Sequence, residues 1–564
     1  MRVANAIVEF LQAAGVSNTY GMVGESVLDV VDAVSETSGV QYTPVRHEQA
    51  GALAASGFAR TTTEPAVCLG HVGAGASNLV NGMADAYKDD LPVIALTGNA
   101  ETSSLGRDVW HEVDHLAMFE PVTDWNVRID HPERVPQIMR EAMNRLNTGT
   151  PAPIHIDLPS DVAAADLPPE AETELAAALE ATPEPSPPRN RVAPAPDQVD
   201  EAVKRFLDAE NPVILAGGEA LTAGADDALG TLIEYARCPL LTSLTARGVV
   251  SEYDDYCFGA LGTLGRIAAK SVADEADFVL ALGSSLTDIE TFNFSLFADS
   301  DIVQVSLAEG DLARQYSVEQ AVLADPRTFT SAFDAALRDR TDGPLDEPPG
   351  MDDYRAEFRG ELEDITEPDP GALNDTDEGL VSPYVPLTKI AEAKAPGDVV
   401  CSASGKNTLW SSLIPIEESG TFLKSVGLGT MGFAFPAGIG VQTARPDATV
   451  YAVIGDGDFS MVAQELETCV REDLPLVVVV FNDDTLSSIK IQQGDSYGER
   501  YVGVDYTTVD FATVAEGFGA TGVRVESGEE FEDALATAER VDGPVVIDTA
   551  IDPSIRAPAL YYET

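Results

Sequence analysis

A short acidic stretch, Gly455-Asp456-Gly457, stands directly after a continuous apolar run, Thr449–Ile454. A second apolar run, Leu474–Phe481, ends at Asn482. Carboxylate and amide oxygens are ligands that Mg²⁺ prefers, since this ion takes a few protein oxygens together with substrate phosphates. The two glycines let backbone amides approach a phosphate closely. These residue types therefore predict a metal-bridged diphosphate site.

The two apolar runs are the elements that must position these side chains. Continuous apolar, β-branched runs are typical of strands buried on both faces of a parallel sheet. Between them, Ser460 is expected to cap a helix whose apolar residues share one face. The segment is thus predicted to form one right-handed βαβ unit. Asp456 and Asn482 would then lie at the carboxyl ends of parallel strands, where open α/β sheets bind ligands.

Gly-Asp-Gly followed about two dozen residues later by Asn resembles the diphosphate-binding signature of thiamine-diphosphate enzymes. The resemblance implies that Asp456 and Asn482 ligate Mg²⁺ through their side chains, and that the main-chain carbonyl of Asp484 is the third protein ligand. It also implies that four further residues bind the cofactor, namely Asn407, Gly455, Gly457 and Asp458. Taken without the resemblance, the two motif residues are an Asp in a tight turn and an Asn that ends a strand.

A second candidate lies in the segment Val45–Thr61, VRHEQAGALAASGFART. A strand is predicted to end near Arg46 and a helix to begin near Glu48, in largely apolar surroundings where one partner can decide the ionisation of a carboxylate. By itself Glu48 would be a residue that stabilises the helix dipole. The family resemblance makes it the catalytic glutamate, hydrogen-bonded to a ring nitrogen of the aminopyrimidine. The segment His71–Asn78 resembles the glycine-rich turn of the same pyrimidine-binding domain.

The segment Gly427–Gly432 has the form GxGxxG. A dinucleotide site is not favoured, because no strong strand precedes the motif and no acidic residue follows at the expected distance. In the thiamine-diphosphate family the corresponding Gly429 offers its carbonyl to the cofactor's amino group, and Met431 wedges between the two cofactor rings. Packing of Met431 as a core residue is the alternative.

The run His111-Glu112-Val113-Asp114-His115 fits HExxH, the pattern of a zinc-hydrolase helix. A zinc hydrolase that uses His111, Glu112 and His115 is therefore a remote alternative. The same stretch resembles a segment that lines the substrate pocket of acetohydroxyacid synthases, which implies a pocket role for Trp110 and His111, with plain packing as the alternative. Further pocket residues are expected at Leu486 and Lys490.

The charge of the chain is strongly negative, at −60 over 564 residues. The acidic residues are dispersed along the chain, and Lys is scarce, with 8 Lys against 26 Arg. We expect adaptation to a high-salt cytoplasm, where screening removes self-repulsion, and neither nucleic acid nor an anionic membrane as a partner. The 5 cysteines are scattered and predict no disulfide framework. No stretch approaches the length of a membrane span.

The chain is predicted to be an α/β protein with three parallel-sheet domains. The expected ranges are 1–165 for a pyrimidine-binding domain, 197–335 for a central Rossmann-like domain and 384–564 for a diphosphate-binding domain with a C-terminal tail. Segments 166–196 and 336–383 are rich in Pro and acidic residues and are expected to be linkers, the second with one short helix.

The resemblance covers nearly the whole chain and is to the acetolactate-synthase-like branch of the thiamine-diphosphate decarboxylases and carboligases. It implies decarboxylation of a 2-oxo acid with carboligation, and a homodimer or homotetramer with active sites between subunits. A non-ligating decarboxylase of the benzoylformate or sulfopyruvate type is the alternative. Some synthases hold FAD in the central domain. Here the family's Arg-rich segment reads GSSLTDIE (Gly283–Glu290), which argues against FAD.

Overall fold

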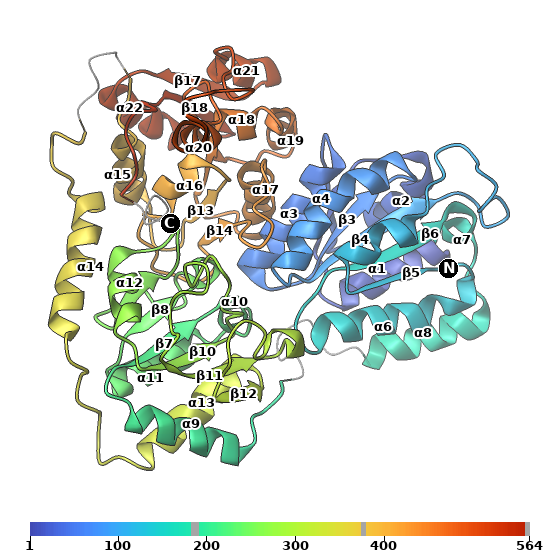
Figure 1. The fold of residues 1–564 in the computed structure, drawn as a ribbon. Coiled ribbons are helices and arrows are strands. Elements are labelled where there is room, and N and C mark those ends of the chain that lie inside the picture. Colours follow the sequence, from blue (N-terminus) through green and yellow to red (C-terminus); the bar gives the residue numbers. More distant parts are fainter. Residues whose placement is uncertain (182–190, 374–379, 559–564) are drawn as a thin grey trace.

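The computed structural model describes residues 1–181, 191–373 and 380–558. In these ranges the chain forms three six-stranded sheets with all strands parallel, and helices cover both faces of each sheet (Figure 1). The strands occupy residues 18–159, 212–323 and 399–550. The predicted fold class, three parallel-sheet α/β domains, is confirmed.

The N-terminal sheet has the strand order β2-β1-β3-β4-β6-β5. Its strands are β1 (Asn18–Gly21), β2 (Gln41–Pro44), β3 (Ala66–Gly70), β4 (Val93–Asn99), β5 (Trp125–Arg128) and β6 (Ile154–Pro159). Helices α3 (Glu48–Thr62) and α4 (Ala74–Lys88) contribute to the core on one face. The core on the other face is formed with α1 (Val3–Ala13), α2 (Leu28–Glu36), α6 (Val135–Asn147) and α7 (Ser160–Ala164).

The C-terminal sheet repeats this topology, with the order β14-β13-β15-β16-β18-β17. Its strands are β13 (Val399–Ser402), β14 (Phe422–Lys424), β15 (Val450–Gly455), β16 (Val477–Asn482), β17 (Thr521–Val525) and β18 (Val545–Ala550). One face packs with α17 (Ala434–Ala444) and α21 (Phe511–Phe518), and the other with α15 (Tyr384–Ala393), α16 (Lys406–Ser411) and α22 (Gly528–Ala538).

The central sheet has the Rossmann order, β12-β11-β10-β7-β8-β9. Its strands are β7 (Pro212–Ala216), β8 (Leu240–Thr242), β9 (Cys257–Ala260), β10 (Phe278–Leu282), β11 (Asp301–Ser306) and β12 (Gln320–Leu323). Its faces are covered by α9 (Pro196–Asp208), α11 (Asp226–Ala236) and α13 (Pro326–Arg338) on one side and by α12 (Ile267–Asp274) on the other.

The predicted unit around Asp456 is present, with one local difference. Strands β15 and β16 are parallel neighbours, so Asp456 and Asn482 both lie at the carboxyl ends of these strands. The connection is not one helix capped by Ser460. It contains α18 (Asp456–Phe459) and α19 (Leu466–Arg471), and the Ser460 hydroxyl donates to the carbonyl of Asp456 at 2.8 Å. The helix is interrupted because Val462 has a non-helical φ of −133°.

Both segments expected to be linkers contain a helix. Helix α8 (Pro169–Ala181) buries Leu175 and Ala178 in the core that it shares with α6. Helix α14 (Met351–Thr366) lies along the outer side of the central and C-terminal domains (Figure 1) and buries Phe358. Apolar residues three or four apart give each helix one buried stripe despite its acidic composition. The remaining linker residues 182–190 and 374–379, and the predicted tail from 559, lie outside the described residues.

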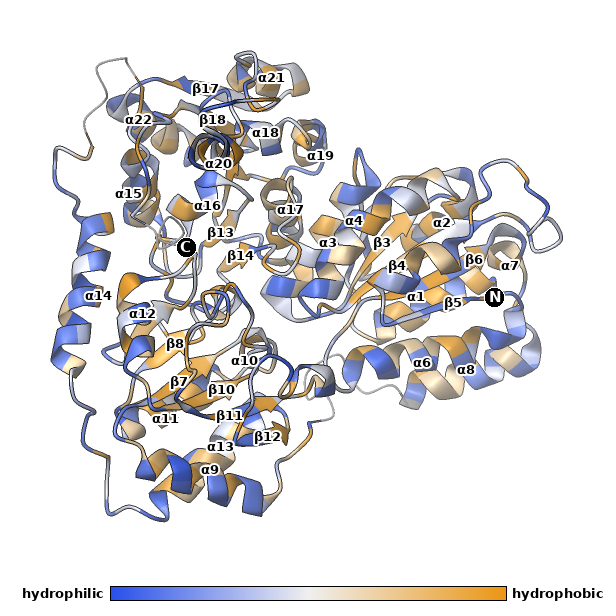
Figure 2. Cartoon of the chain, in the orientation of Figure 1, coloured by the Kyte–Doolittle hydropathy of each residue, from blue (hydrophilic) through white to orange (hydrophobic). Residues whose placement is uncertain are grey.

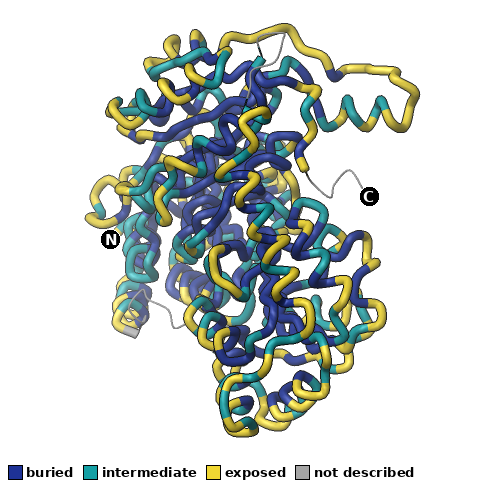
Figure 3. The backbone as a smooth tube through the Cα atoms, turned by 90° about the vertical axis from the view of Figure 1, so that its left-hand side faces the viewer, coloured by how far each residue is buried: buried dark blue, intermediate teal, exposed yellow. Residues whose placement is uncertain are grey.

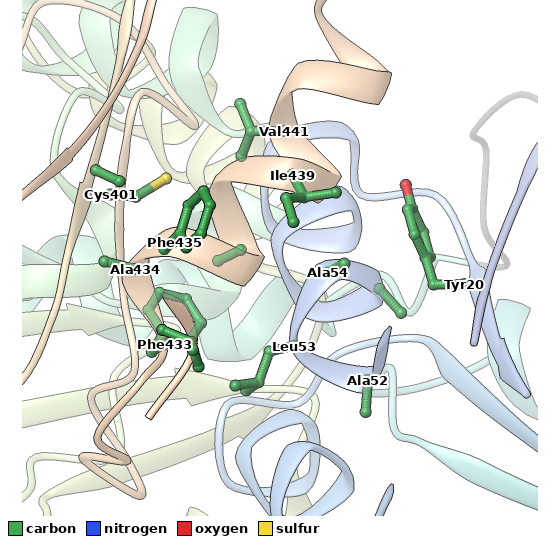
Figure 4. Packing of buried hydrophobic residues seen from close by; sticks show 14 of the residues in the cluster. Tyr20, Ala52, Leu53, Ala54, Cys401, Phe433, Ala434, Phe435, Ile439 and Val441 are labelled. Carbon is green, nitrogen blue, oxygen red and sulfur yellow. The ribbon is translucent and has the colours of Figure 1, made fainter. Parts of the chain in front are cut away.

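Helices α3 and α17 pack against each other and join the N- and C-terminal domains into one continuous core (Figure 4). Glycine is needed where they touch, since a Cβ on Gly57 would lie 2.2 Å from the carbonyl oxygen of Ala437. Strands are apolar and buried while outward helix faces are polar (Figures 2 and 3). All five cysteines are buried and unpaired. Within the described ranges, no helix is long and apolar enough to cross a membrane.

Candidate cofactor site

A cavity opens in the C-terminal domain where the order of the strands reverses. The loops after β13 and β15 diverge there, and open α/β sheets bind ligands at such points. The cavity has a volume of about 350 Å³, within the range of small-molecule sites. The predicted site residues on its wall are Asn407, Met431, Gly455, Asp456, Gly457, Asp458 and Leu486.

Asp456 stands in a concentration of negative charge at the ends of β15 and β16. Its side chain is buried, and Oδ1 accepts the N–H of Gly457 at 2.7 Å. Burial, and then the charge of Asp483, raise the pKa of Asp456 to about 7. A divalent cation would compensate this charge and favour the ionised carboxylate. The donor set therefore fits a hard cation such as Mg²⁺.

Asn482 and Asp484 present oxygens at the same strand ends. Asn482 donates its amide hydrogens to Oδ1 of Asp548 at 2.9 Å and to the carbonyl of Val509 at 3.0 Å. The amide oxygen of Asn482 is thus the atom that remains for a cation. The carbonyl of Asp484 accepts the N–H of Tyr506 at 2.7 Å and keeps a second lone pair. Neither residue lines the cavity itself, in contrast to Asp456.

The glycines beside Asp456 keep this wall of the cavity open. A Cβ on Gly457 would lie 3.0 Å from Cδ2 of Leu486, and one on Gly455 would lie 3.4 Å from Oδ1 of Asn407. Asp458 also lines the cavity, and one of its carboxylate oxygens accepts the N–H of Ser404 at 3.0 Å. Burial raises the pKa of Asp458 to about 7. The loop can therefore admit a phosphate beside its backbone.

The apolar part of the cavity comes from three segments. Met431 lies on its wall, together with Ile489 and with Leu264 of the central domain. Gly429 precedes Met431 with a φ of +66°, in the left-handed region that favours glycine. The carbonyl of Gly429 accepts the hydroxyl of Ser404 at 2.9 Å and is not part of the cavity wall.

Two lysines on the wall were not predicted. The Lys424 ammonium donates to the carbonyl of Ala403 at 3.1 Å, and burial lowers the pKa of Lys424 to about 8. The Lys406 ammonium donates to the carbonyl of Pro553 at 2.6 Å, and burial lowers its pKa. The sequence signal was their position, because each follows or ends an apolar strand run in a chain that has only 8 Lys.

Glu48 is the first residue of α3 and is 6% exposed. Its Oε2 accepts the side-chain N–H of Asn78 at 2.9 Å, and a Cβ on Gly75 would lie 2.9 Å from its Oε1. The predicted strand, turn and helix are thus present around Glu48. Glu48 is not among the residues that line the cavity beside Asp456, so the single chain does not unite the two predicted parts of the site.

The four predicted substrate-pocket residues are dispersed. Leu486 lines the cavity, whereas Lys490 pairs with Asp505 at 2.6 Å outside it. Trp110 is 87% exposed on the N-terminal domain, where its ring stacks on that of His111 with centroids 4.4 Å apart.

The HExxH interpretation is wrong, because these residues do not form one helix. His111 lies in a turn with a φ of +67°, and α5 (His115–Phe119) begins only at His115. The His111 ring faces His71 with centroids 5.3 Å apart, while His115 is completely buried elsewhere. Glu112 accepts the N–H of Val109 at 3.1 Å. The remote zinc-hydrolase alternative thereby loses its structural basis.

The expectation against FAD concerns the corresponding crevice of the central sheet, which lies between all three domains. Its cavity has a volume of about 150 Å³, below that of typical ligand sites. At its strand ends, Glu219 accepts the N–H groups of Leu307 at 2.9 Å and Ala308 at 3.2 Å, and Glu290 accepts that of Thr287 at 3.0 Å. These backbone donors are therefore already paired with the chain's own carboxylates.

Models of the thiamine pyrophosphate enzyme family match along the chain. The N-terminal TPP binding domain matches residues 1–118, the central domain 199–333 and the C-terminal TPP binding domain 403–549. A probable acetolactate synthase large subunit of Methanocaldococcus jannaschii is 33% identical over 99% of this chain and 93% of its own length. The acetolactate synthase large subunit of Corynebacterium glutamicum is 31% identical over 97% of this chain and 86% of its own length. The acetolactate synthase isozyme 2 large subunit of Escherichia coli is 30% identical, covering 98% and 96%.

Proposed function

This chain belongs to the thiamine pyrophosphate enzyme family, and on that premise we propose that it decarboxylates a 2-oxo acid and joins the product to a second 2-oxo acid, as in acetolactate synthesis. The proposal includes thiamine diphosphate and Mg²⁺ as cofactors. The observation that carries it is the cavity at the β13/β15 switch point, where Asp456 and the two flanking glycines line one wall. The names of the relatives agree with this activity.

In this proposal the polar wall holds the diphosphate through a metal. Asp456 and Asn482 supply side-chain oxygens, and the carbonyl of Asp484 supplies a third. Asn407 and the backbone of Gly455 and Gly457 lie beside the phosphates, with Asp458 fixing the neighbouring loop through Ser404. Two lysine ammonium groups near the wall add positive charge. These groups orient the cofactor and take no part in bond breaking.

The apolar wall and Glu48 would act at the reacting end. Met431 and Leu486 line the cavity and would limit the space for the cofactor rings and exclude water there. Gly429 would offer its carbonyl to the aminopyrimidine. When bound, thiamine diphosphate supplies an electron sink for the carbon that loses CO₂. Asn78 engages Oε2 of Glu48, which leaves Oε1 to hold and pass a proton.

Because Glu48 does not line the cavity beside Asp456, we propose that a partner subunit supplies it. The complete site would then lie between two chains, which makes a dimer the smallest active assembly. Exposed apolar side chains near the carboxyl end of the N-terminal sheet, Met22, Val23 and Trp110, suit burial at such an interface. Trp110 and His111 would approach the substrate only in this assembly.

A product assay tests the reaction. The purified protein is supplied with thiamine diphosphate, Mg²⁺ and pyruvate, with and without 2-oxobutyrate, and the products are separated by chromatography. We expect acetolactate from pyruvate alone and a mixed acetohydroxy acid with both substrates. Release of acetaldehyde without a ligated product would contradict carboligation and support a simple decarboxylase. No cofactor-dependent release of CO₂ from these or from aromatic and sulfonated 2-oxo acids would contradict the proposal as a whole.

A further inference from the structure

A buried polar chain connects the N-terminal sheet to the glycine-rich turn beside Glu48. The carboxylate of Asp157 accepts Nδ1–H of His115 at 2.9 Å, and Nε2 of His115 accepts the backbone N–H of Gly73 at 3.0 Å. Asp157 and His115 are both 0% exposed. We propose that His115 is a positioning residue, which holds the turn 71–75 against Glu48. The inference rests on the proposed function, in which Glu48 transfers the proton.

The partners of His115 define its protonation state. An ionised carboxylate only accepts hydrogen bonds, so Nδ1 of His115 must carry the proton that is donated to Asp157. Nε2 faces a backbone N–H and must therefore be unprotonated. Asp157 is itself fixed, because its Oδ2 accepts Nε–H of Arg128 at 2.6 Å and Nδ2–H of Asn99 at 2.8 Å. The imidazole is thus a neutral acceptor with a set orientation.

The backbone that His115 holds leads directly to Glu48. Gly73 is the residue before α4 and has a φ of +68°. A Cβ on Gly73 would lie 2.1 Å from the carbonyl oxygen of His111. Only glycine therefore lets the turn come this close. Gly75, in the first turn of α4, packs against Oε1 of Glu48, and Asn78 donates to Oε2 at 2.9 Å. A shift at Gly73 would move both contacts of the carboxylate.

A metal ion is a competing interpretation of these residues. Ligand atoms of His115, His155 and Asp157 lie within 4.8 Å of one another. The hydroxyl oxygen of Thr97 already lies between them, at 2.8 Å from Nε2 of His155, 3.0 Å from Oδ1 of Asp157 and 3.2 Å from Nδ1 of His115. A metal would have to displace this hydroxyl and the His115 proton. The hydrogen-bonded arrangement explains the cluster without an ion.

His155 provides an internal control. It is as buried as His115 and stacks on Phe119 with ring centroids 4.0 Å apart. Its Nε2 bonds Thr97, and within the described chain its Nδ1 has no hydrogen-bond partner. Among the described residues, His155 makes no hydrogen bond to the turn 71–75. Replacing it disturbs the same cluster and leaves the Gly73 contact in place.

Two substitutions of His115 separate positioning from packing. In His115→Gln the side-chain oxygen can take the place of Nε2 and accept from Gly73, whereas in His115→Asn the side-chain nitrogen can take the place of Nδ1 and donate to Asp157. Amide hydrogen exchange of residues 71–75 is measured in the cofactor-free protein, and kcat in the loaded enzyme. His155→Asn is the matched control for loss of side-chain volume.

We expect His115→Asn to speed exchange in the turn by about tenfold and to lower kcat by about 10- to 100-fold, since small misplacements of catalytic groups have effects of this size. His115→Gln and His155→Asn should stay near wild type in both measurements. Equal effects of His115→Asn and His115→Gln on the turn, or unchanged exchange in His115→Asn, would overturn the proposal. Exchange in the cofactor-free protein does not depend on the reaction, so failure of the proposed function would be seen separately.

A measurement on the unsubstituted protein covers the case in which a variant does not fold. Nitrogen NMR shifts of labelled histidine distinguish the two neutral tautomers from the cation. At neutral pH we expect His115 to be neutral with its proton on Nδ1. A cationic His115, or one protonated on Nε2, could not accept from Gly73 and would overturn the proposal.

Discussion

At the scale of single residues, Glu48 is the clearest test of the proposed chemistry. Glu48→Gln keeps the size of the side chain and the hydrogen bond with Asn78 but cannot exchange a proton. We expect thiamine diphosphate to bind with little change, while turnover falls by about 100-fold or more, in the range of general acid–base effects. Proton–deuterium exchange at the thiazolium carbon should slow in parallel.

Asn78→Ala is a useful comparison, because it removes the partner of Glu48 and keeps the carboxylate. Its exchange rate should fall between those of wild type and Glu48→Gln. If Glu48→Gln retains turnover and exchange near wild type, Glu48 only stabilises the start of α3. Cofactor retention is measured separately by gel filtration and thiamine fluorescence, so loss of binding cannot be mistaken for loss of activation.

Residue types in a motif could be predicted because the chemistry demands them. Asp456 and Asn482 stand out as polar residues at the ends of apolar runs, whereas Glu48 was identified only through the family resemblance of its segment. Lys424 was missed although it ends an apolar strand run, because that position alone does not predict that the ammonium group is buried beside a cavity. The role of His115 was also missed, since its partners Gly73 and Asp157 are 42 residues away on either side and meet only in the fold.

At the scale of elements, the proposed metal site depends on two parallel strands ending together. Asp456→Ala or Asn482→Ala removes one of the proposed oxygen ligands at the ends of β15 and β16. We expect the Mg²⁺ concentration for half-maximal activity to rise by roughly tenfold or more. Asp456→Asn, which keeps one side-chain oxygen without the charge, should have a smaller effect. The measurement is a Mg²⁺ titration after treatment with a chelator.

Asp505→Ala is the control for this titration, because it removes a carboxylate of the same domain that pairs with Lys490 outside the cavity. Its Mg²⁺ requirement should equal that of wild type. An Asp456→Ala protein that keeps its cofactor and activity after chelation would show that Asp456 is not a ligand.

Strands made of continuous apolar runs were predictable, whereas helices with few apolar residues among acidic ones were not. Strands β15 and β16 overlap the apolar runs that predicted them, Thr449–Ile454 and Leu474–Phe481. Helix α8 was assigned to a linker and α14 was expected only as a short helix within one, because their acidic and proline-rich surroundings hid narrow apolar stripes. The helix after Asp456 was predicted as one piece, because the apolar spacing continues across the break at Val462.

At the scale of the whole molecule, the net charge of −60 sets the response to salt. We expect the apparent thermal unfolding midpoint to rise from low salt to molar KCl, because screening over about 3 Å at 1 M removes repulsion among dispersed carboxylates. An uncharged osmolyte at equal osmolality is the control. A midpoint that does not depend on KCl would contradict adaptation to high salt.

The assembly proposed for the active site can be tested by complementation. In a symmetric dimer, each site would take Glu48 from one chain and Asp456 with Asn482 from the other. Glu48→Gln and Asp456→Ala are each expected to be inactive alone. When both are co-expressed, a mixed dimer carries both lesions in one site and leaves the second site intact. Random pairing makes half of the dimers mixed, so about one quarter of wild-type activity should return.

The matched control co-expresses Asp456→Ala with Asn482→Ala. Both lesions then lie in the same half of the site, and each site of a mixed dimer keeps one of them, so activity should not rise above that of the single variants. Mixed dimers are purified with two different affinity tags before the decarboxylation assay, which establishes that they formed. Background activity in purified Glu48→Gln and Asp456→Ala mixed dimers would mean that each chain builds its own site. Glu48 would then have to reach the cavity beside Asp456 by a movement of the N-terminal domain, which the packing of α3 on α17 opposes.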